Sequence, residues 1–197
     1  MLGGSWFIVT NNRNLPIVSL VLAFLYISIF IFDRLVFNGV LFQFGSGKSF
    51  NLMQQNEWYR ILTGTFFHKN ILHLLANVFA IYYVGLILED KIGRLVFLLI
   101  YLIGNIGTYI IYSILISYTD GNGASPGIYA LIICIVILHY KNPTLLNLNF
   151  KSYPVQFTIG YFIIGNFFNL GAFTVHLIGV VIGALLIFFF LIAGILL

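Results

Sequence analysis

The sequence predicts an all-α polytopic membrane protein, a bundle of six transmembrane helices that makes residues 1–197 one domain without a separate soluble domain. Of its 197 residues, 61% are hydrophobic and only 7% are charged. The mean hydropathy of +1.06 excludes an ordinary soluble domain. Six apolar segments also approach the length of about 20 residues that a helix needs to cross a bilayer core of about 30 Å.

The six predicted spans are Leu15–Phe37, Ile71–Leu88, Leu95–Tyr118, Pro126–Tyr140, Tyr153–Phe168 and Ala172–Leu197. The first span is too long for the apolar region of a signal peptide and lacks a small-residue cleavage site, so we expect it to be retained. The segment Asn38–Asn70 separates the first two spans and mixes Gly, Gln, Asn and aromatic residues. This composition predicts an ordered loop at the membrane interface.

Six spans place both chain termini on one side of the membrane. Five basic residues fall on that side: Arg13, Lys91, Arg94, Lys141 and Lys151. Four fall on the other: Arg34, Lys48, Arg60 and Lys69. This small bias predicts a multi-pass protein of the cell membrane with cytoplasmic termini. Because the basic residues are scattered and the net charge is only +4, the sequence predicts no nucleic-acid surface.

The fourth span is short. Pro126–Tyr140 has 15 residues, which give a helix of about 22 Å, some 8 Å less than a bilayer core of about 30 Å. If its polar end lies at the inner surface, the preceding segment Asp120–Ala124 must dip into the membrane. Irregular backbone at that depth persists only inside protein or beside a water-filled cavity. We therefore expect Ser125 at the floor of a water-filled depression.

Four polar side chains begin three of the spans on the same side of the membrane. His73 and Asn77 lie in the first turns of the second span, Ser125 opens the fourth, and His176 opens the sixth. Each has a structural alternative, because Ser125 followed by Pro126 is a good helix cap and the others could join helices by hydrogen bonds. Ionisable residues inside spans are costly, however, and mark functional sites by default.

Together these side chains predict nucleophilic acyl transfer. A neutral His176 can accept the Ser125 proton while the hydroxyl attacks a carbonyl. Donors for the resulting oxyanion can come from the helix start, His73 and Asn77. No carboxylate is well placed to orient His176, which favours a Ser-His dyad over a triad.

Small and aromatic residues favour close packing around this site. Gly179 and Gly183 share a helix face with His176, and Gly123 and Gly127 have the same four-residue spacing. Close approach of the fourth and sixth spans would bring His176 near Ser125. Tyr129, one turn below Ser125, could then pack against the imidazole.

The chain resembles the rhomboid intramembrane serine proteases, in their basic six-span form and over nearly its whole length. The matching groups, in chain order, are Glu57-Trp58-Tyr59-Arg60; Thr63, Phe67, His68, His73 and Asn77; Gly85, Glu89 and Gly93; Gly123-Ala124-Ser125 with Tyr129; and His176, Gly179 and Gly183. Two positions depart from the family pattern. Tyr59 stands where the family often has Trp before the arginine, and Pro126 stands where it commonly has Gly.

The resemblance implies a rhomboid-like fold and a role for each matching residue. Ser125 would be the nucleophile and His176 the general base. His73, Asn77 and the Ser125 N–H would form the oxyanion hole, and Tyr129 would stack on His176. Arg60, Glu89 and His68 would be structural and hold the loops. The implied partners are the lipid bilayer and transmembrane protein substrates, cut in or near a membrane span on the outer side without a cofactor.

Four other functions compete with this reading. An inactive rhomboid-like protein that binds membrane helices would typically lack the serine or the histidine, and this chain has both. A transporter or channel predicts midplane charges or internal repeats, which the sequence lacks. A metalloprotease would need an HExxH motif, and no carboxylate completes a metal site with the histidines. An aspartyl protease would need two acidic residues within spans, and the sequence has no such pair.

Overall fold

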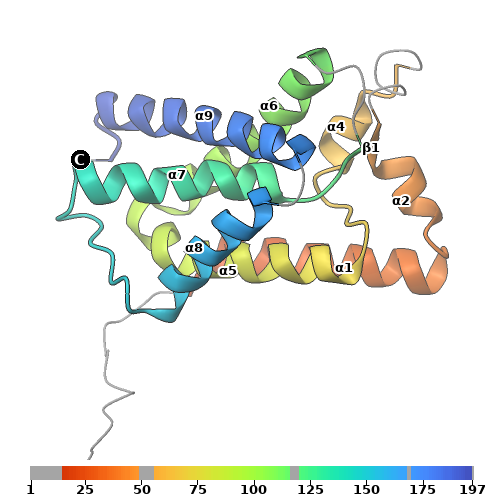
Figure 1. Ribbon diagram of the computed structural model, residues 1–197, viewed down its shortest axis with the longest axis horizontal. Coiled ribbons are helices and arrows are strands. Elements are labelled where there is room, and N and C mark those ends of the chain that lie inside the picture. The colour runs from red at the N-terminus through yellow and green to blue at the C-terminus, as the bar shows by residue number, and fades with distance from the viewer. Residues whose placement is uncertain (1–14, 49–55, 116–119, 168–169, 197) are drawn as a thin grey trace, which may run out of the picture.

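Helices make up most of the computed structural model, which describes residues 15–48, 56–115, 120–167 and 170–196 (Figure 1). Eight helices lie in these ranges. Four are long and apolar enough to cross a membrane: α1 (Ile17–Val36), α5 (Ile71–Ile92), α6 (Arg94–Leu115) and α9 (Leu170–Ile192). The predicted all-α membrane fold is therefore confirmed.

The two remaining predicted spans correspond to shorter helices. The fourth is α7 (Ser125–Lys141), with 17 residues, and the fifth is α8 (Tyr153–Phe167), with 15. Three of the predicted ends, at residues 118, 168 and 197, lie outside the described residues, and α9 ends at residue 192, before a turn. A helix of 17 residues is about 26 Å long, still short of a bilayer core of about 30 Å. The count of six spans stays a prediction.

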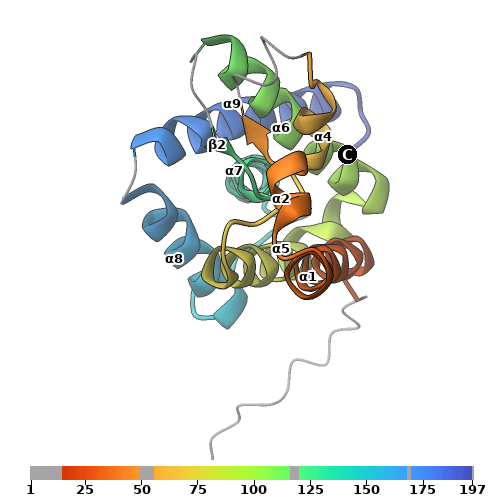
Figure 2. The same cartoon turned by 90° about the vertical axis from the view of Figure 1, so that its right-hand side faces the viewer.

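Helix α7 lies in the middle of the bundle, and Figure 2 shows it end-on with other helices around it. Eleven of its 17 residues are buried. This explains why its sequence is apolar on nearly every side, since a helix that is buried over most of its surface has no polar stripe.

Helix α9 packs directly against the backbone of α7. A Cβ atom at Gly179 would lie 2.5 Å from the Pro126 carbonyl oxygen, and one at Gly183 would lie 2.2 Å from that of Ala130. Only glycine allows this approach. Gly127, by contrast, faces the Tyr101 backbone and ring of α6. The expectation that this glycine shares the contact with the sixth span is therefore wrong.

Glu89 joins α5 to the beginning of α1. Its buried carboxylate accepts hydrogen bonds from the Val18 N–H at 2.9 Å, the Ser19 N–H at 3.0 Å and the Ser19 hydroxyl at 2.9 Å. Helix α1 begins after Pro16, which provides no side-chain cap, so Glu89 satisfies the free N–H groups of its first turn. The predicted structural role of Glu89 thus concerns a helix end and not a loop.

The segment between α1 and α5 contains α2 (Val40–Gly45), β1 (Gly47–Lys48) and α4 (Tyr59–Thr63), while its residues 49–55 lie outside the described part. Arg60 is only 3% exposed. Its guanidinium donates to the carbonyl oxygens of Gln43 at 2.8 Å and Ser46 at 2.9 Å, and to the Glu57 carboxylate at 2.6 Å. Strand β1 pairs with β2 (Asp120–Gly121), just before α7. The loop therefore supports the backbone that leads into Ser125.

Candidate active site

The backbone before Ser125 turns sharply into α7. Gly123 has a φ of +104°, a conformation that side chains disfavour. Its N–H donates to the Gly64 carbonyl at 2.9 Å, and the Tyr109 hydroxyl donates to its carbonyl at 3.0 Å. The Asn105 amide donates to the Ala124 carbonyl at 3.3 Å. Protein groups thus satisfy hydrogen-bonding groups of this irregular backbone.

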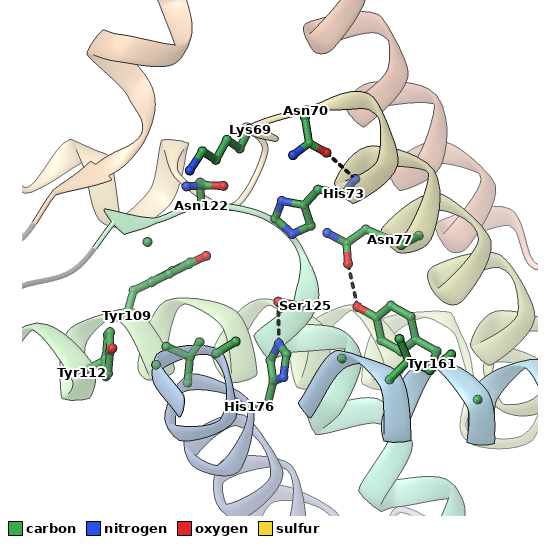
Figure 3. Close-up of a pocket in the computed structure, with 18 of the residues that line it drawn as sticks. Lys69, Asn70, His73, Asn77, Tyr109, Tyr112, Asn122, Ser125, Tyr161 and His176 are labelled. Carbon is green, nitrogen blue, oxygen red and sulfur yellow. Dashed lines mark hydrogen bonds between the residues drawn. The ribbon is translucent and has the colours of Figure 1, made fainter. Parts of the chain in front are cut away.

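Ser125 and His176 are hydrogen-bonded partners on neighbouring helices (Figure 3). The Ser125 Oγ lies 3.0 Å from the His176 Nε2. Both residues are buried, with exposed fractions of 9% and 7%. The close contact between α7 and α9 explains the pairing. Gly179, which makes this contact, lies only one turn after His176 in α9, so the imidazole is held near Ser125.

Tyr129 fixes the plane of the imidazole. Its ring stacks on that of His176, with centroids 3.9 Å apart and planes inclined by 7°. The Tyr129 hydroxyl donates to the carbonyl oxygens of Tyr161 at 3.3 Å and Phe162 at 3.1 Å, near the end of α8. The expected position of Tyr129 under the histidine is thus found, with an added tie to α8.

His73 and Asn77 approach Ser125 from α5 (Figure 3). Asn70 caps this helix by accepting from the His73 N–H at 2.9 Å, which sets where the helix begins. A Cβ atom at Gly123 would lie 2.9 Å from the His73 Nε2 and 3.2 Å from the Asn77 Nδ2. Both side chains therefore border the backbone that leads into Ser125.

The Asn77 amide is almost fully buried, at 1% exposure, and its Nδ2 has no hydrogen-bond partner among the described residues. Its Oδ1 accepts from the Tyr161 hydroxyl of α8 at 2.6 Å. This bond directs the Nδ2 away from Tyr161. A buried donor without a partner costs about 1–3 kcal/mol, so this group, which has no acceptor among the described residues, is available to one that enters the cavity.

His68 lies behind His73. Its ring is 2% exposed and meets the His73 ring edge-on, with centroids 5.2 Å apart. Burial, and to a lesser degree the neighbouring His73, lowers the pKa of His68 to about 3. A neutral His68 therefore lies against His73, and its structural role stays a prediction.

Two side chains of α8 form hydrogen bonds with the predicted site residues and were not expected from the sequence. They are Tyr161, on Asn77, and Asn166, whose Oδ1 lies 2.9 Å from the His176 Nδ1. The sequence could have indicated Asn166, because the predicted fifth span ends on the side of the membrane where the second, fourth and sixth begin. Its position predicts a polar group at the same depth as Ser125.

A cavity of about 880 Å³ opens above these groups. It is lined by Ser125, His176, His73 and Asn77, and also by Lys69 and Asn122 (Figure 3). Within the described ranges, no three His, Cys, Asp or Glu residues are grouped to hold a metal ion. The cavity thus presents a hydroxyl, an imidazole and fixed donors, which suit acyl transfer.

Comparison with known proteins gives the family. The family model described as Rhomboid domain matches residues 55–193. The chain is 31% identical over 141 residues to YdcA of Bacillus subtilis (strain 168), a protein named for the rhomboid proteases, covering 66% of this chain and 70% of YdcA.

Two further relatives match smaller shares of their own length. Rhomboid protease GluP of the same organism is 34% identical over 125 residues, which cover 60% of this chain and 24% of GluP. Inactive RHOMBOID-like protein 8 of Arabidopsis thaliana is 27% identical over 130 residues, which cover 62% of this chain and 37% of that protein. Together with its apolar helices, these matches establish that the chain is an integral membrane protein and belongs to the rhomboid family.

Proposed function

We propose that this protein is an intramembrane serine endopeptidase that cuts transmembrane segments of membrane proteins near the outer face of the membrane. The observation that carries the proposal is the 3.0 Å contact between the buried side chains of Ser125 (Oγ) and His176 (Nε2), which both line the cavity. The Asn77 Nδ2 beside it, which has no hydrogen-bond partner in the described part of the chain, supports the same chemistry.

In the first step, the His176 Nε2 accepts the Ser125 hydroxyl proton while the Oγ attacks the scissile carbonyl carbon. A tetrahedral intermediate with a negatively charged oxygen forms. The imidazolium then donates its proton to the leaving nitrogen, and the carbon–nitrogen bond breaks. An ester between Ser125 and the substrate's acyl part remains.

The oxyanion of this intermediate needs donors that are already in place. The Ser125 N–H, the Asn77 Nδ2 and His73 are our candidates for this role. Ser125 is the first residue of α7, so its N–H has no partner within the helix. Pro126 has no N–H to add, which makes the side-chain donors from α5 more important here.

Hydrolysis of the ester completes the cycle. A water molecule in the cavity attacks the acyl carbon and transfers a proton to His176. The bond to the Ser125 Oγ breaks, and this oxygen recovers the proton. The cavity supplies the water, which the surrounding lipid would exclude.

We also propose an orientation of the chain in the membrane. The chain would lie in the cell membrane with both termini in the cytoplasm and with the open end of the cavity toward the outer side. The basic residues Lys91, Arg94, Lys141 and Lys151 would then face the cytoplasm, in accord with the positive-inside bias.

A protein that binds membrane helices without cutting them is the competing function, because one relative is named inactive. Reconstitution with a single-span substrate distinguishes the two. We expect the wild type to cut, Ser125→Ala and His176→Ala to be inactive, and the control Ser152→Ala at the other end of the bundle to cut normally. Cleavage by Ser125→Ala at the wild-type rate would refute the mechanism, and wild-type protein that binds but never cuts the substrate would indicate the inactive function.

A further inference from the structure

The His176 imidazole is held at both of its nitrogens. Its Nε2 lies 3.0 Å from the Ser125 Oγ, and its Nδ1 lies 2.9 Å from the Asn166 Oδ1. Asn166 belongs to the last turn of α8, a different helix from those that carry the serine and the histidine. The amide thus contacts the ring on the side away from the nucleophile.

The orientation of the Asn166 amide is fixed by a second bond. Its Nδ2 donates to the Phe162 carbonyl, one turn earlier in α8, at 2.7 Å. A carbonyl can only accept, so the nitrogen of the amide must be on this side. The oxygen is left to face His176.

This arrangement decides which imidazole nitrogen carries the hydrogen. The amide oxygen can only accept, so the His176 Nδ1 must be the protonated nitrogen of the neutral ring. The Nε2 then has a free lone pair directed at the Ser125 hydroxyl. A general base for this serine requires that tautomer.

We infer that Asn166 is a positioning residue that holds His176 in the tautomer and rotation needed to accept the Ser125 proton. The inference rests on the proposed protease function for its consequence, but the tautomer itself can be measured without activity. Stacking on Tyr129 fixes the plane of the ring, yet it does not distinguish the two tautomers or a rotation within that plane. Asn166 supplies both of these constraints.

A neutral amide suits this location better than a carboxylate. Among the cavity-lining residues that the structure describes there is no acid, and an unpaired carboxylate at membrane depth is costly. Among the described residues, the titratable or charged groups that line the cavity with His176 are Lys69, His73, Tyr109, Tyr112 and Tyr161, and Tyr129 stacks on its ring. Asn166 therefore acts where the aspartate of a triad would act, without adding a charge.

The tautomer is tested by ¹⁵N NMR of protein labelled at histidine, in detergent micelles at pH 8. The signal of His176 among the four histidines is assigned with His176→Gln. We expect hydrogen on Nδ1 in the wild type and a substantial Nε2–H population in Asn166→Ala. Hydrogen on Nε2 in the wild type, or the same tautomer in both proteins, would overturn the inference.

The catalytic consequence is tested by the rate at which a fluorophosphonate labels Ser125. We expect Asn166→Ala to lower this rate about 10-fold, in line with the loss of one orienting hydrogen bond. Gln156→Ala is the matched control, since it removes an exposed amide of the same helix outside the cavity lining. A rate for Asn166→Ala equal to that of the wild type would contradict a positioning role.

Asn166→Asp tests the positioning role through the pH dependence of serine labelling, which would not change if Asn166 were merely structural. It keeps the size and the acceptor oxygen but adds a negative charge, which stabilises the imidazolium. The acid limb of the labelling profile should therefore shift to higher pH, by about one unit; an unshifted limb would count against the inference. If wild-type protein is not labelled at all, the proposed function fails. The NMR measurement still tests whether Asn166 sets the His176 tautomer.

Discussion

At the scale of single residues, the site is built from pairs in which one side chain orients another. The Tyr129 ring sets the plane of His176, and the Tyr161 hydroxyl sets the direction of the Asn77 amide. The Asn77 Nδ2, by contrast, has no hydrogen-bond partner among the described residues. This leaves a donor free to stabilise charge that develops only during a reaction.

Tyr161→Phe tests the orientation of Asn77. The variant keeps the ring but loses the 2.6 Å bond to the Asn77 Oδ1, so the amide can rotate and its donor is less often in place. We expect kcat for a single-span substrate to fall about 10-fold, equivalent to ~1.4 kcal/mol, with little change in KM. Tyr140→Phe, which removes an exposed hydroxyl at the far end of α7, serves as the control. A fall in both variants, or in neither, would contradict this role.

His68 predicts a dependence of stability on pH. Its pKa is about 3 in the folded protein and 6.5 as a model value, so the unfolded chain takes up the proton first as the pH falls. The stability due to neutral His68 is thus complete above pH 6.5 and is lost between pH 6.5 and 3, at up to about 1.4 kcal/mol per pH unit. In His68→Asn, the free energy of unfolding should fall less steeply over this range, measured by steric trapping in bicelles. An unchanged slope would show that His68 is not the responsible group.

At the scale of elements, α7, α8 and α9 contribute differently to the site. Helix α9 lies against α7 through two glycines and has little freedom to separate from it. Helix α8 has only two buried residues, Val155 and Thr158, but it supplies Tyr161, Asn166 and the acceptors for Tyr129. The least buried of these three helices therefore carries the groups that orient the others.

Gly183→Val tests the contact between α7 and α9. The new side chain would collide with the Ala130 carbonyl, because even a Cβ atom would lie 2.2 Å from it. We expect α9 to shift away from α7, with a loss of about 1–3 kcal/mol of stability and of serine labelling.

Gly160→Ala is the control for stability, since no atom lies within 4 Å of its added Cβ. It should leave the thermal unfolding midpoint unchanged or slightly higher, as expected for alanine in a helix. If both variants unfold at the wild-type temperature, the proposed close contact does not limit the packing of α9.

At the scale of the whole molecule, the fold lowers one serine below the end of a helical bundle and keeps a cavity open above it. The short central α7 and the loop carrying α2 and α4 together produce this arrangement. The cavity volume of about 880 Å³ is large enough for water and part of a peptide, since drug-sized ligand sites measure about 300–1,000 Å³.

Ser125→Cys tests this depth and access. The natural Cys134 is fully buried, so the wild type should be inert to thiol reagents and the new thiol can be followed alone. We expect Ser125→Cys in proteoliposomes to react with a small methanethiosulfonate but not with a polyethylene-glycol maleimide. Failure to react with either reagent would exclude a water-filled cavity above residue 125.

Much of this arrangement could be predicted from the sequence, for physical reasons. Long apolar runs indicate spans, and the spans predicted to begin at Ile71 and Pro126 start within one residue of α5 and α7. Alternation of spans across the membrane then brings His73, Asn77, Ser125 and His176 to one end of the bundle.

The rest depends on helix rotation, which hydropathy does not encode. Tyr161 and Asn166 lie in an apolar helix whose sequence does not reveal which side faces α5 or α9. Gly127 shares the spacing of the other glycines, yet it faces Tyr101 of α6. Contacts between helices decide these roles, and a single sequence contains no direct record of them.

The most direct test of the central claim, that His176 activates Ser125 as a nucleophile, is the mass of the protein after exposure to a fluorophosphonate in proteoliposomes. We expect one covalent adduct on the wild type, located at Ser125 by peptide mass spectrometry, and none on Ser125→Ala. We expect a rate at least about 100-fold lower for His176→Ala, because the general base is lost. An adduct on another residue, or equal labelling of the wild type and His176→Ala, would contradict it.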